Sequence, residues 1–206
     1  MVVEQLSGGS DNFCYLIVSS TDKKAALVDP SLDATTALTY IKDHALTLEY
    51  IILTHYHSDH TAALPNVKRH HPLAKIVASQ LDSKFITPKV NQIVKNGSKL
   101  TVGAIPLTII HTPGHTPGGI CILVDDEALI TGDTLFIGDC GRTDLTGGSM
   151  KTMYETLQNK ILPLPNHLIV YPGHDYGDQP SDTLGHQKKT NKTLKAKTLQ
   201  DFAWIP

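Results

Sequence analysis

One short apolar run in this sequence leads into a dense group of residue types that bind metals. Residues 51–53 are apolar, and the next seven positions include His55, His57, Asp59 and His60. Side chains of an extended strand repeat with a period of two, so we expect His55 and His57 to point the same way. A turn into a helix at Asp59 would aim two more ligands at the same space. Imidazole and carboxylate groups at this density predict a zinc or iron site.

Three later motifs end an apolar run with a glycine and one polar residue, namely His115, Asp133 and His174. Taken singly, each is also compatible with an ordinary turn. Taken together with the first group, they predict strand ends that converge on one point. His111 belongs to the run before His115, and we expect it to be structural or to support a ligand. Five further histidines are scattered and are not assigned to the site: His44, His70, His71, His167 and His186.

Apolar runs that alternate with turn residues predict an α/β fold. We expect strands at 13–19, 25–29, 50–54, 75–78, 90–94, 99–102, 105–111, 119–124, 128–131 and 167–171. We expect helices at 33–44 (capped by Asp33), at 59–70 (interrupted at Pro65), at 148–161 and over most of 183–202. This order fits two mixed sheets with helices outside, an αββα sandwich, as a single domain over residues 1–206.

The composition excludes several other functions. The net charge is −2 and no basic stripe is visible, so we expect no nucleic-acid partner. No apolar run reaches the roughly 18 residues that a membrane span needs. The cysteines, Cys14, Cys121 and Cys140, are odd in number and widely spaced, which argues against a disulfide framework. The N-terminus shows no secretory signal, so we expect a cytoplasmic protein.

The order His55-x-His57-x-Asp59-His60, followed by His115, Asp133 and His174, resembles the signature of the metallo-β-lactamase superfamily over essentially the whole chain. That resemblance implies the αββα sandwich. It also implies a first metal held by His55, His57 and His115. A second metal would be held by Asp59, His60 and His174, with Asp133 bridging. The β-lactamases of this superfamily usually carry cysteine in place of Asp133, and its diiron flavoproteins usually carry glutamate in place of His57.

Two enzyme branches fit the remaining pattern. Persulfide dioxygenases are iron enzymes that oxidise glutathione persulfide, and glyoxalase II is a zinc or iron thioester hydrolase. The string Cys140-Gly-Arg-Thr-Asp resembles the dioxygenases, as does His174-Asp-Tyr. Only 32 residues follow His174, too few for the helical C-terminal domain of glyoxalase II. Thr190 and Lys192 depart from the usual dioxygenase tail, and short hydrolases without that domain exist, so both branches stay open.

Resemblance to the dioxygenases implies one Fe(II), held by His55, His115 and Asp133, with free positions for sulfur and O₂. His57, Asp59, His60 and His174 would then orient the ligands and hold water. Tyr176 would hydrogen-bond near the open face of the metal. Arg142 would bind a substrate carboxylate, or would instead pair with Asp139 or Asp144. Cys140 is interpreted as a small buried residue rather than a reactive thiol.

Resemblance to the hydrolases implies two Zn(II) ions that share a hydroxide, oriented by Asp59. The expected substrate is a small-molecule thiol, as a persulfide in the first branch and as a thioester in the second. A non-catalytic metal-binding module is a third alternative, but a structural zinc needs only four ligands and the sequence offers seven. The sequence sets no oligomeric state, and a homodimer stays open.

Overall fold

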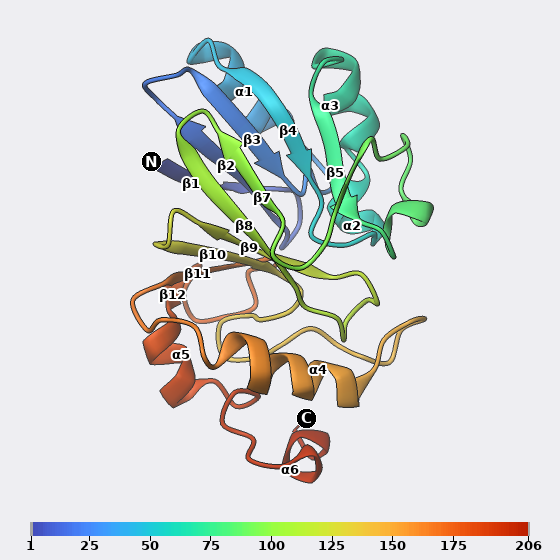
Figure 1. The fold of residues 1–206 in the computed structure, drawn as a ribbon, viewed down its shortest axis with the longest axis vertical. Helices are drawn as coiled ribbons and strands as arrows, with labels where there is room; N and C mark the ends of the chain where they lie inside the picture. The colour runs from blue at the N-terminus through green and yellow to red at the C-terminus, as the bar shows by residue number, and fades with distance from the viewer. Residues whose placement is uncertain (1, 206) are drawn as a thin grey trace.

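The chain folds into two β-sheets that lie face to face, with helices on both outer sides (Figure 1). The computed structural model describes residues 2–205, and within them each sheet has six strands. The first sheet contains, in order, β1 (Val2–Ser7), β2 (Phe13–Ser19), β3 (Lys24–Val28), β4 (Thr47–Ile52), β5 (Lys75–Ser79) and β6 (Gln92–Val94). The second sheet contains, in order, β7 (Lys99–Val102), β8 (Ile105–His111), β9 (Ile120–Val124), β10 (Ala128–Gly132), β11 (Ile169–Pro172) and β12 (Asp182–Thr183).

Helices from the two halves of the chain cover opposite faces. The first sheet is covered by α1 (Thr35–Asp43), α2 (Ser58–Thr61) and α3 (Leu64–His70). The second is covered by α4 (Met150–Thr156), α5 (Leu184–Thr190) and α6 (Leu199–Ala203), with a π-helical turn, η2 (Leu157–Ile161), continuing α4. A short 3₁₀ turn, η1 (Ser83–Phe85), follows β5. The αββα sandwich expected from the sequence is confirmed.

Side chains that point alternately to the two faces of each strand fill three apolar layers. In β2, Leu16 packs with Ile41 of α1 on the outer side, whereas Ile17 packs with Ile109 of β8 between the sheets. Both faces of the strand are therefore buried, which explains why residues 14–18 read as a continuous apolar run. Burial of each such leucine or isoleucine contributes about 1.5–3 kcal/mol.

Parallel pairing brings the ends of several strands to one edge. β3, β4 and β5 run parallel, so the residues that follow β3 and β4 emerge side by side. β10 and β11 are also parallel, and Gly132 pairs with Pro172. Asn12, in the turn between β1 and β2, forms a bridge with His174 of the other sheet. The candidate ligands consequently leave both sheets at the same end of the sandwich.

Two helices of the N-terminal half differ from expectation. α1 begins at Thr35, and Asp33 caps it from two residues away, because its Oδ1 accepts a hydrogen bond of 2.8 Å from Thr35 N. The helix expected at 59–70 is divided into α2 and α3. Pro65 does not cause this break, because it lies in the first turn of α3, where its missing N–H leaves no bond unmade.

Three further segments differ toward the chain ends. The strand β1 was not expected from the sequence, which offers no strict alternation there. The helix expected at 148–161 begins at Met150 and changes to a π-helical turn after Thr156. The helical region expected at 183–202 is interrupted at 191–198, between α5 and α6. The buried side chain of Asn191 turns the chain there by accepting a hydrogen bond from Thr193 N.

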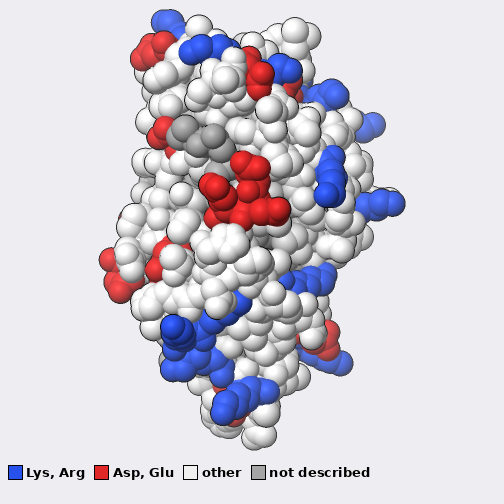
Figure 2. Space-filling view, turned by 60° about the vertical axis from the view of Figure 1, so that its left-hand side comes forward, with Lys and Arg blue, Asp and Glu red and all other residues white. Residues whose placement is uncertain are grey.

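On the molecular face drawn in Figure 2, one group of acidic side chains gathers near mid-height. Lysine and arginine side chains lie around it, at the top, along the right-hand side and in the lower part, where Figure 1 places α5 and the C-terminal segment. No helix within residues 2–205 has both the length and the apolar character to cross a membrane.

Candidate metal centre

Strand ends and the loops that follow them supply the candidate ligands. His55 lies three residues after β4, and His57 is the extended N-cap residue of α2. That short helix turns the chain back, which places His60 fully buried beneath the other ligands. His115 comes from the loop between β8 and β9. Asp133 and His174 follow the parallel strands β10 and β11, one and two residues after the strands end.

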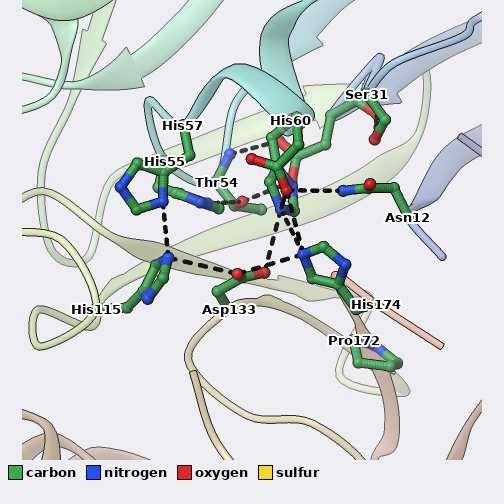
Figure 3. Close-up of polar contacts among 12 residues, drawn as sticks. Asn12, Ser31, Thr54, His55, His57, His60, His115, Asp133, Pro172 and His174 are labelled. Atoms are coloured by element: carbon green, nitrogen blue, oxygen red, sulfur yellow. Dashed lines mark hydrogen bonds and ion pairs between the residues drawn. The ribbon is translucent and has the colours of Figure 1, made fainter. Parts of the chain in front are cut away.

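Six of the seven side chains form two groups in space (Figure 3). The ligand atoms of His55, His57 and His115 lie within 4.8 Å of one another. Those of Asp59, His60 and His174 also lie within 4.8 Å of one another. Groups of three ligand atoms at such separations could each hold one metal ion.

Asp133 lies between the two groups. Its Oδ1 is 3.2 Å from His60 Nε2, and its Oδ2 is 3.4 Å from His115 Nε2 and 3.5 Å from His174 Nε2. Figure 3 shows the carboxylate between His115 and His174. A carboxylate whose Oδ1 faces the second group and whose Oδ2 faces both groups is in position to bridge two metals, or to serve as the carboxylate ligand of one.

A metal ion fits the chemistry of His55. Its Nδ1 lies 3.1 Å from Thr54 Oγ1, which itself donates to Asp29 and so accepts from the imidazole. The lone pair of His55 is therefore on Nε2, which is buried and has no hydrogen-bond partner within residues 2–205. Leaving such a group unpaired costs about 1–3 kcal/mol, and a metal ion would supply the missing partner.

The electrostatics of the site also favour a cation. Burial opposes the charged form of His60, but the carboxylates of Asp133 and Asp29 outweigh it and raise the pKa of His60 well above its usual range. In the same way Asp133 and Asp59 raise the pKa of His174 to about 9. Facing these imidazoles, the pKa of Asp133 is held well below its usual range despite burial. The buried carboxylates thus favour a positive charge between the two groups of candidate ligands.

Comparison with known proteins agrees with this geometry. The family model described as the metallo-beta-lactamase superfamily matches residues 7–174. The chain belongs to this superfamily. Its resemblance to that signature, expected from the sequence, is confirmed.

Relatives within the superfamily include both branches expected from the sequence. A probable polyketide biosynthesis zinc-dependent hydrolase, BaeB of Bacillus velezensis, is 32% identical over 93% of this chain and 85% of its own. The human mitochondrial persulfide dioxygenase ETHE1 is 32% identical over 90% of this chain and 72% of its own. Hydroxyacylglutathione hydrolase 2 of Vibrio vulnificus is 32% identical over 98% and 84%. The crystal structure of ETHE1 from Myxococcus xanthus matches with a TM-score of 0.88, at 29% identity, over 100% and 92% of the two chains.

Asp29 contributes to this metallo-β-lactamase site although sequence reasoning missed it. Its Oδ1 accepts from Thr54 N at 2.8 Å, and its Oδ2 accepts from Thr54 Oγ1 at 2.6 Å and lies 3.0 Å from His60 Nδ1. It therefore orients His60 directly and His55 through Thr54. The position right after the apolar run of β3, like the positions after β4 and β10, is the signal that could have identified it.

Asn12 was also missed. Its Nδ2 donates a 3.1 Å hydrogen bond to Asp59 Oδ2, which fixes the carboxylate toward His174 (Figure 3). His111, by contrast, stays outside the site, because its Nε2 lies 3.0 Å from the carbonyl oxygen of Pro117. It is the structural histidine that the sequence suggested.

A cavity of about 350 Å³ opens onto the ligands. It exposes His57, Asp59, His115, Asp133 and His174, and its other walls are Phe136, Asp139, Cys140, Arg142, Leu145 and Tyr176. A second cavity of about 520 Å³ shares Asp139, Cys140 and Arg142 with the first and extends toward α6. The two hollows meet at these three residues, and the first, which opens onto the candidate ligands, is called the cleft below.

Arg142 and Tyr176 lie on the wall of this cleft. Arg142 forms a two-point ion pair with Asp144, with both N–O distances at 2.7 Å, and its backbone carbonyl is 2.7 Å from His115 Nδ1. The Tyr176 ring stacks on His174 with centroids 4.6 Å apart. Burial and Asp11, to which the Tyr176 hydroxyl is hydrogen-bonded, raise the pKa of Tyr176 to about 12.

None of the three thiols has the electrostatics of a nucleophile. Burial raises the pKa of Cys140 to about 12, that of Cys14 to about 12 and that of Cys121 to about 11. Reactive cysteines have a lowered pKa instead. This agrees with the interpretation of Cys140 as a packed residue, although it is half-buried rather than fully buried.

Proposed function

We propose that this protein is an iron-dependent persulfide dioxygenase that oxidises the terminal sulfur of a low-molecular-weight thiol persulfide, such as glutathione persulfide, to sulfite. The observation that carries the proposal is the composition of the cleft. The two segments whose sequence distinguishes the dioxygenase branch, 140–144 and 174–176, contribute Cys140, Arg142 and Tyr176 to the wall of the metal-site cavity. The likeness to ETHE1 in sequence and in structure supports it.

The donor set suits one iron ion. His55, His115 and Asp133 would hold it, since two imidazoles and one carboxylate leave positions open for further ligands. A bound Fe(II) would supply the redox chemistry that joins persulfide sulfur to O₂, a reaction for which zinc is unsuitable. The reaction consumes one persulfide, one O₂ and one water, and it releases the thiol, sulfite and two protons.

Residues of the chain position these ligands and the substrate. The Arg142 carbonyl accepts from His115 Nδ1 and so turns Nε2 of that histidine toward the centre. His60 holds Oδ1 of Asp133, which leaves Oδ2 toward His115. The guanidinium of Arg142 would bind a substrate carboxylate in place of Asp144, since both residues are exposed. Phe136 and Leu145 keep the cavity beside Asp133 partly apolar.

Oxygen consumption tests this proposal. Iron-loaded protein and glutathione persulfide in an oxygen electrode should show O₂ uptake with one sulfite formed for each O₂, and zinc-loaded protein should show none. A variant Arg142→Met should raise KM more than it lowers kcat, and Lys99→Met, at a distant exposed lysine, is the matched control. Absence of O₂ uptake by iron-loaded wild-type protein would refute the proposal.

A second candidate is a zinc-dependent thioester hydrolase. The complete second group, Asp59, His60 and His174, favours it because a two-metal mechanism needs these ligands. BaeB, named as a zinc-dependent hydrolase, is a relative of similar length. Cleavage of S-lactoylglutathione or another thioester at about 1–1000 s⁻¹ by zinc-loaded protein, without O₂ uptake by the iron form, would establish this alternative.

A further inference from the structure

The loop between β10 and α4 carries one wall of the cleft, and the C-terminal segment holds it from behind. Residues 136–139 of this loop are contacted by Gln187 in the middle of α5 and by Asn191, which caps that helix. Gln187 is 2% exposed and Asn191 is 0% exposed. Neither residue touches the candidate ligands, and neither was singled out from the sequence.

Asn191 connects the two segments through both ends of its amide. Its Nδ2 donates to the carbonyl oxygens of Phe136 and Asp139, each at 3.0 Å. Its Oδ1 accepts from Thr193 N at 2.9 Å and from Thr193 Oγ1 at 2.7 Å. Beside it, Oε1 of Gln187 accepts from Gly138 N at 2.8 Å. The backbone of the loop is thus held at three positions by side chains from the tail.

A few direct contacts connect loop 136–139 to the candidate metal centre. Its Phe136 ring lies edge-on to Tyr176 with centroids 5.2 Å apart. Two residues beyond the loop, Gly141 N donates to the carbonyl of Asp133 at 3.1 Å. The next carbonyl, of Arg142, orients His115. Phe136 also lies edge-on to the candidate ligand His174, with centroids 5.7 Å apart. Displacement of the loop would therefore move the cavity wall and this ring contact first, and the other candidate ligands only indirectly.

We propose that Asn191 is a positioning residue that holds loop 136–139, and with it Cys140 and Arg142, in the arrangement that binds the thiol portion of the substrate. Gln187 and Thr193 assist it, since the Thr193 side chain also hydrogen-bonds the Cys140 thiol. The proposal rests on the proposed function only in taking the cleft as the substrate site, whether the substrate is a persulfide or a thioester.

Asn191→Asp tests the proposal in the full-length protein. The new carboxylate keeps the acceptor for Thr193 but replaces the amide donor by an oxygen that faces the two carbonyls and Oε1 of Gln187. Thr193→Val is a milder second variant that keeps the side-chain shape. Thr190→Val is the control, because its exposed hydroxyl contacts only the His186 carbonyl within α5. We expect Asn191→Asp to raise KM about tenfold, as the loss of one to two buried hydrogen bonds predicts, with metal content and kcat nearly unchanged.

Thiol labelling reports on the loop without any substrate. Cys140 should react with a disulfide reagent at least several times faster in Asn191→Asp and in Thr193→Val than in the wild type, while Cys14 and Cys121 stay protected. Unchanged labelling in both variants would overturn the proposal, as would faster labelling with an unchanged KM. Loss of metal with a fall in kcat alone would also overturn it. If O₂ is not consumed, KM is measured for the thioester, so a wrong reaction assignment is recognised separately.

Discussion

Replacement of Asp29 by asparagine should change the proton distribution on His60 while leaving the fold intact. Thr54 N is always a donor, so the oxygen of the introduced amide must take the place of Oδ1. The NH₂ group of that amide then occupies the place of Oδ2, opposite Thr54 Oγ1 and His60 Nδ1. Thr54 Oγ1 can accept from this NH₂ group as well as from His55 Nδ1, but its own proton then loses the acceptor on residue 29. His60, whose raised pKa keeps both ring nitrogens protonated, must give up the proton on Nδ1 and keep only the one on Nε2. That nitrogen faces Asp133.

The expected losses of stability follow from the hydrogen bonds that each Asp29 variant keeps or loses. In Asp29→Asn only the Thr54 hydroxyl proton loses its acceptor, so the loss of stability should stay within about 1–3 kcal/mol. Asp29→Ala leaves Thr54 N and His60 Nδ1 without an acceptor, which costs about 2–6 kcal/mol, a large part of the stability of a typical domain. A residue that supports metal ligands typically changes affinity or activity by about 10–100-fold, and we expect this range for Asp29→Asn.

Four measurements check this prediction. Long-range ¹⁵N–¹H NMR spectra should show His60 of Asp29→Asn as the Nε2–H tautomer. Activity should fall within the stated range, and urea denaturation should show the small loss of stability. In the one-iron proposal the metal stays at one per chain, whereas a fall from two zinc ions to one supports the hydrolase. Asp33→Asn, on the same connecting segment, is the control. Wild-type activity, metal content and tautomer in Asp29→Asn would refute the reasoning.

Four further predictions concern single residues. His115→Ala should remove metal and activity together, and full metal content after this change would contradict the ligand assignment; His167→Ala is the exposed control. His60→Ala should lower activity but leave the iron at one per chain, and atomic absorption checks this. Asp144→Asn frees the Arg142 guanidinium, so KM for an anionic substrate should fall a few-fold, and a rise would contradict a carboxylate-binding role. Gly114→Ala should destabilise the protein by about 2 kcal/mol or more, because its new Cβ would lie 2.5 Å from Met153 Cα at a φ of +144°; an unchanged urea midpoint would contradict this.

Sequence reasoning could predict the candidate ligands because each of their motifs follows the end of an apolar run. His55, Asp133 and His174 all obey this rule, and the order of the motifs resembles one superfamily. Asp29 obeys the rule as well, but Asp-Pro is a common turn sequence and nothing local separates it from such turns. Its role depends on the parallel pairing of β3 with β4, which sets it beside Thr54.

The tail and the short helices were less predictable, because tertiary contacts decide them. Residues 191–198 contain no glycine or proline to mark a helix end. The helix ends at Asn191 because its side chain is engaged by loop 136–139, 52 positions away in the sequence for the bond to Asp139. The break between α2 and α3 likewise arises from tertiary contacts, since the Ala63 N–H donates to the carbonyl of Ser31.

The candidate ligands follow strands of both sheets: His55 and His60 come after β4 of the first, and Asp133 and His174 come after β10 and β11 of the second. A bound ion would therefore link the two sheets of the sandwich where they meet at the site. Ion binding would add about 2.7 kcal/mol to the free energy of unfolding at a concentration 100 times the Kd. Removal of the ion by a chelator should then lower the melting temperature. It should also make the backbone amides around the site exchange with solvent before those of the outer helices. The association of the two sheets and the binding of the ion would then be thermodynamically linked, so that each strengthens the other.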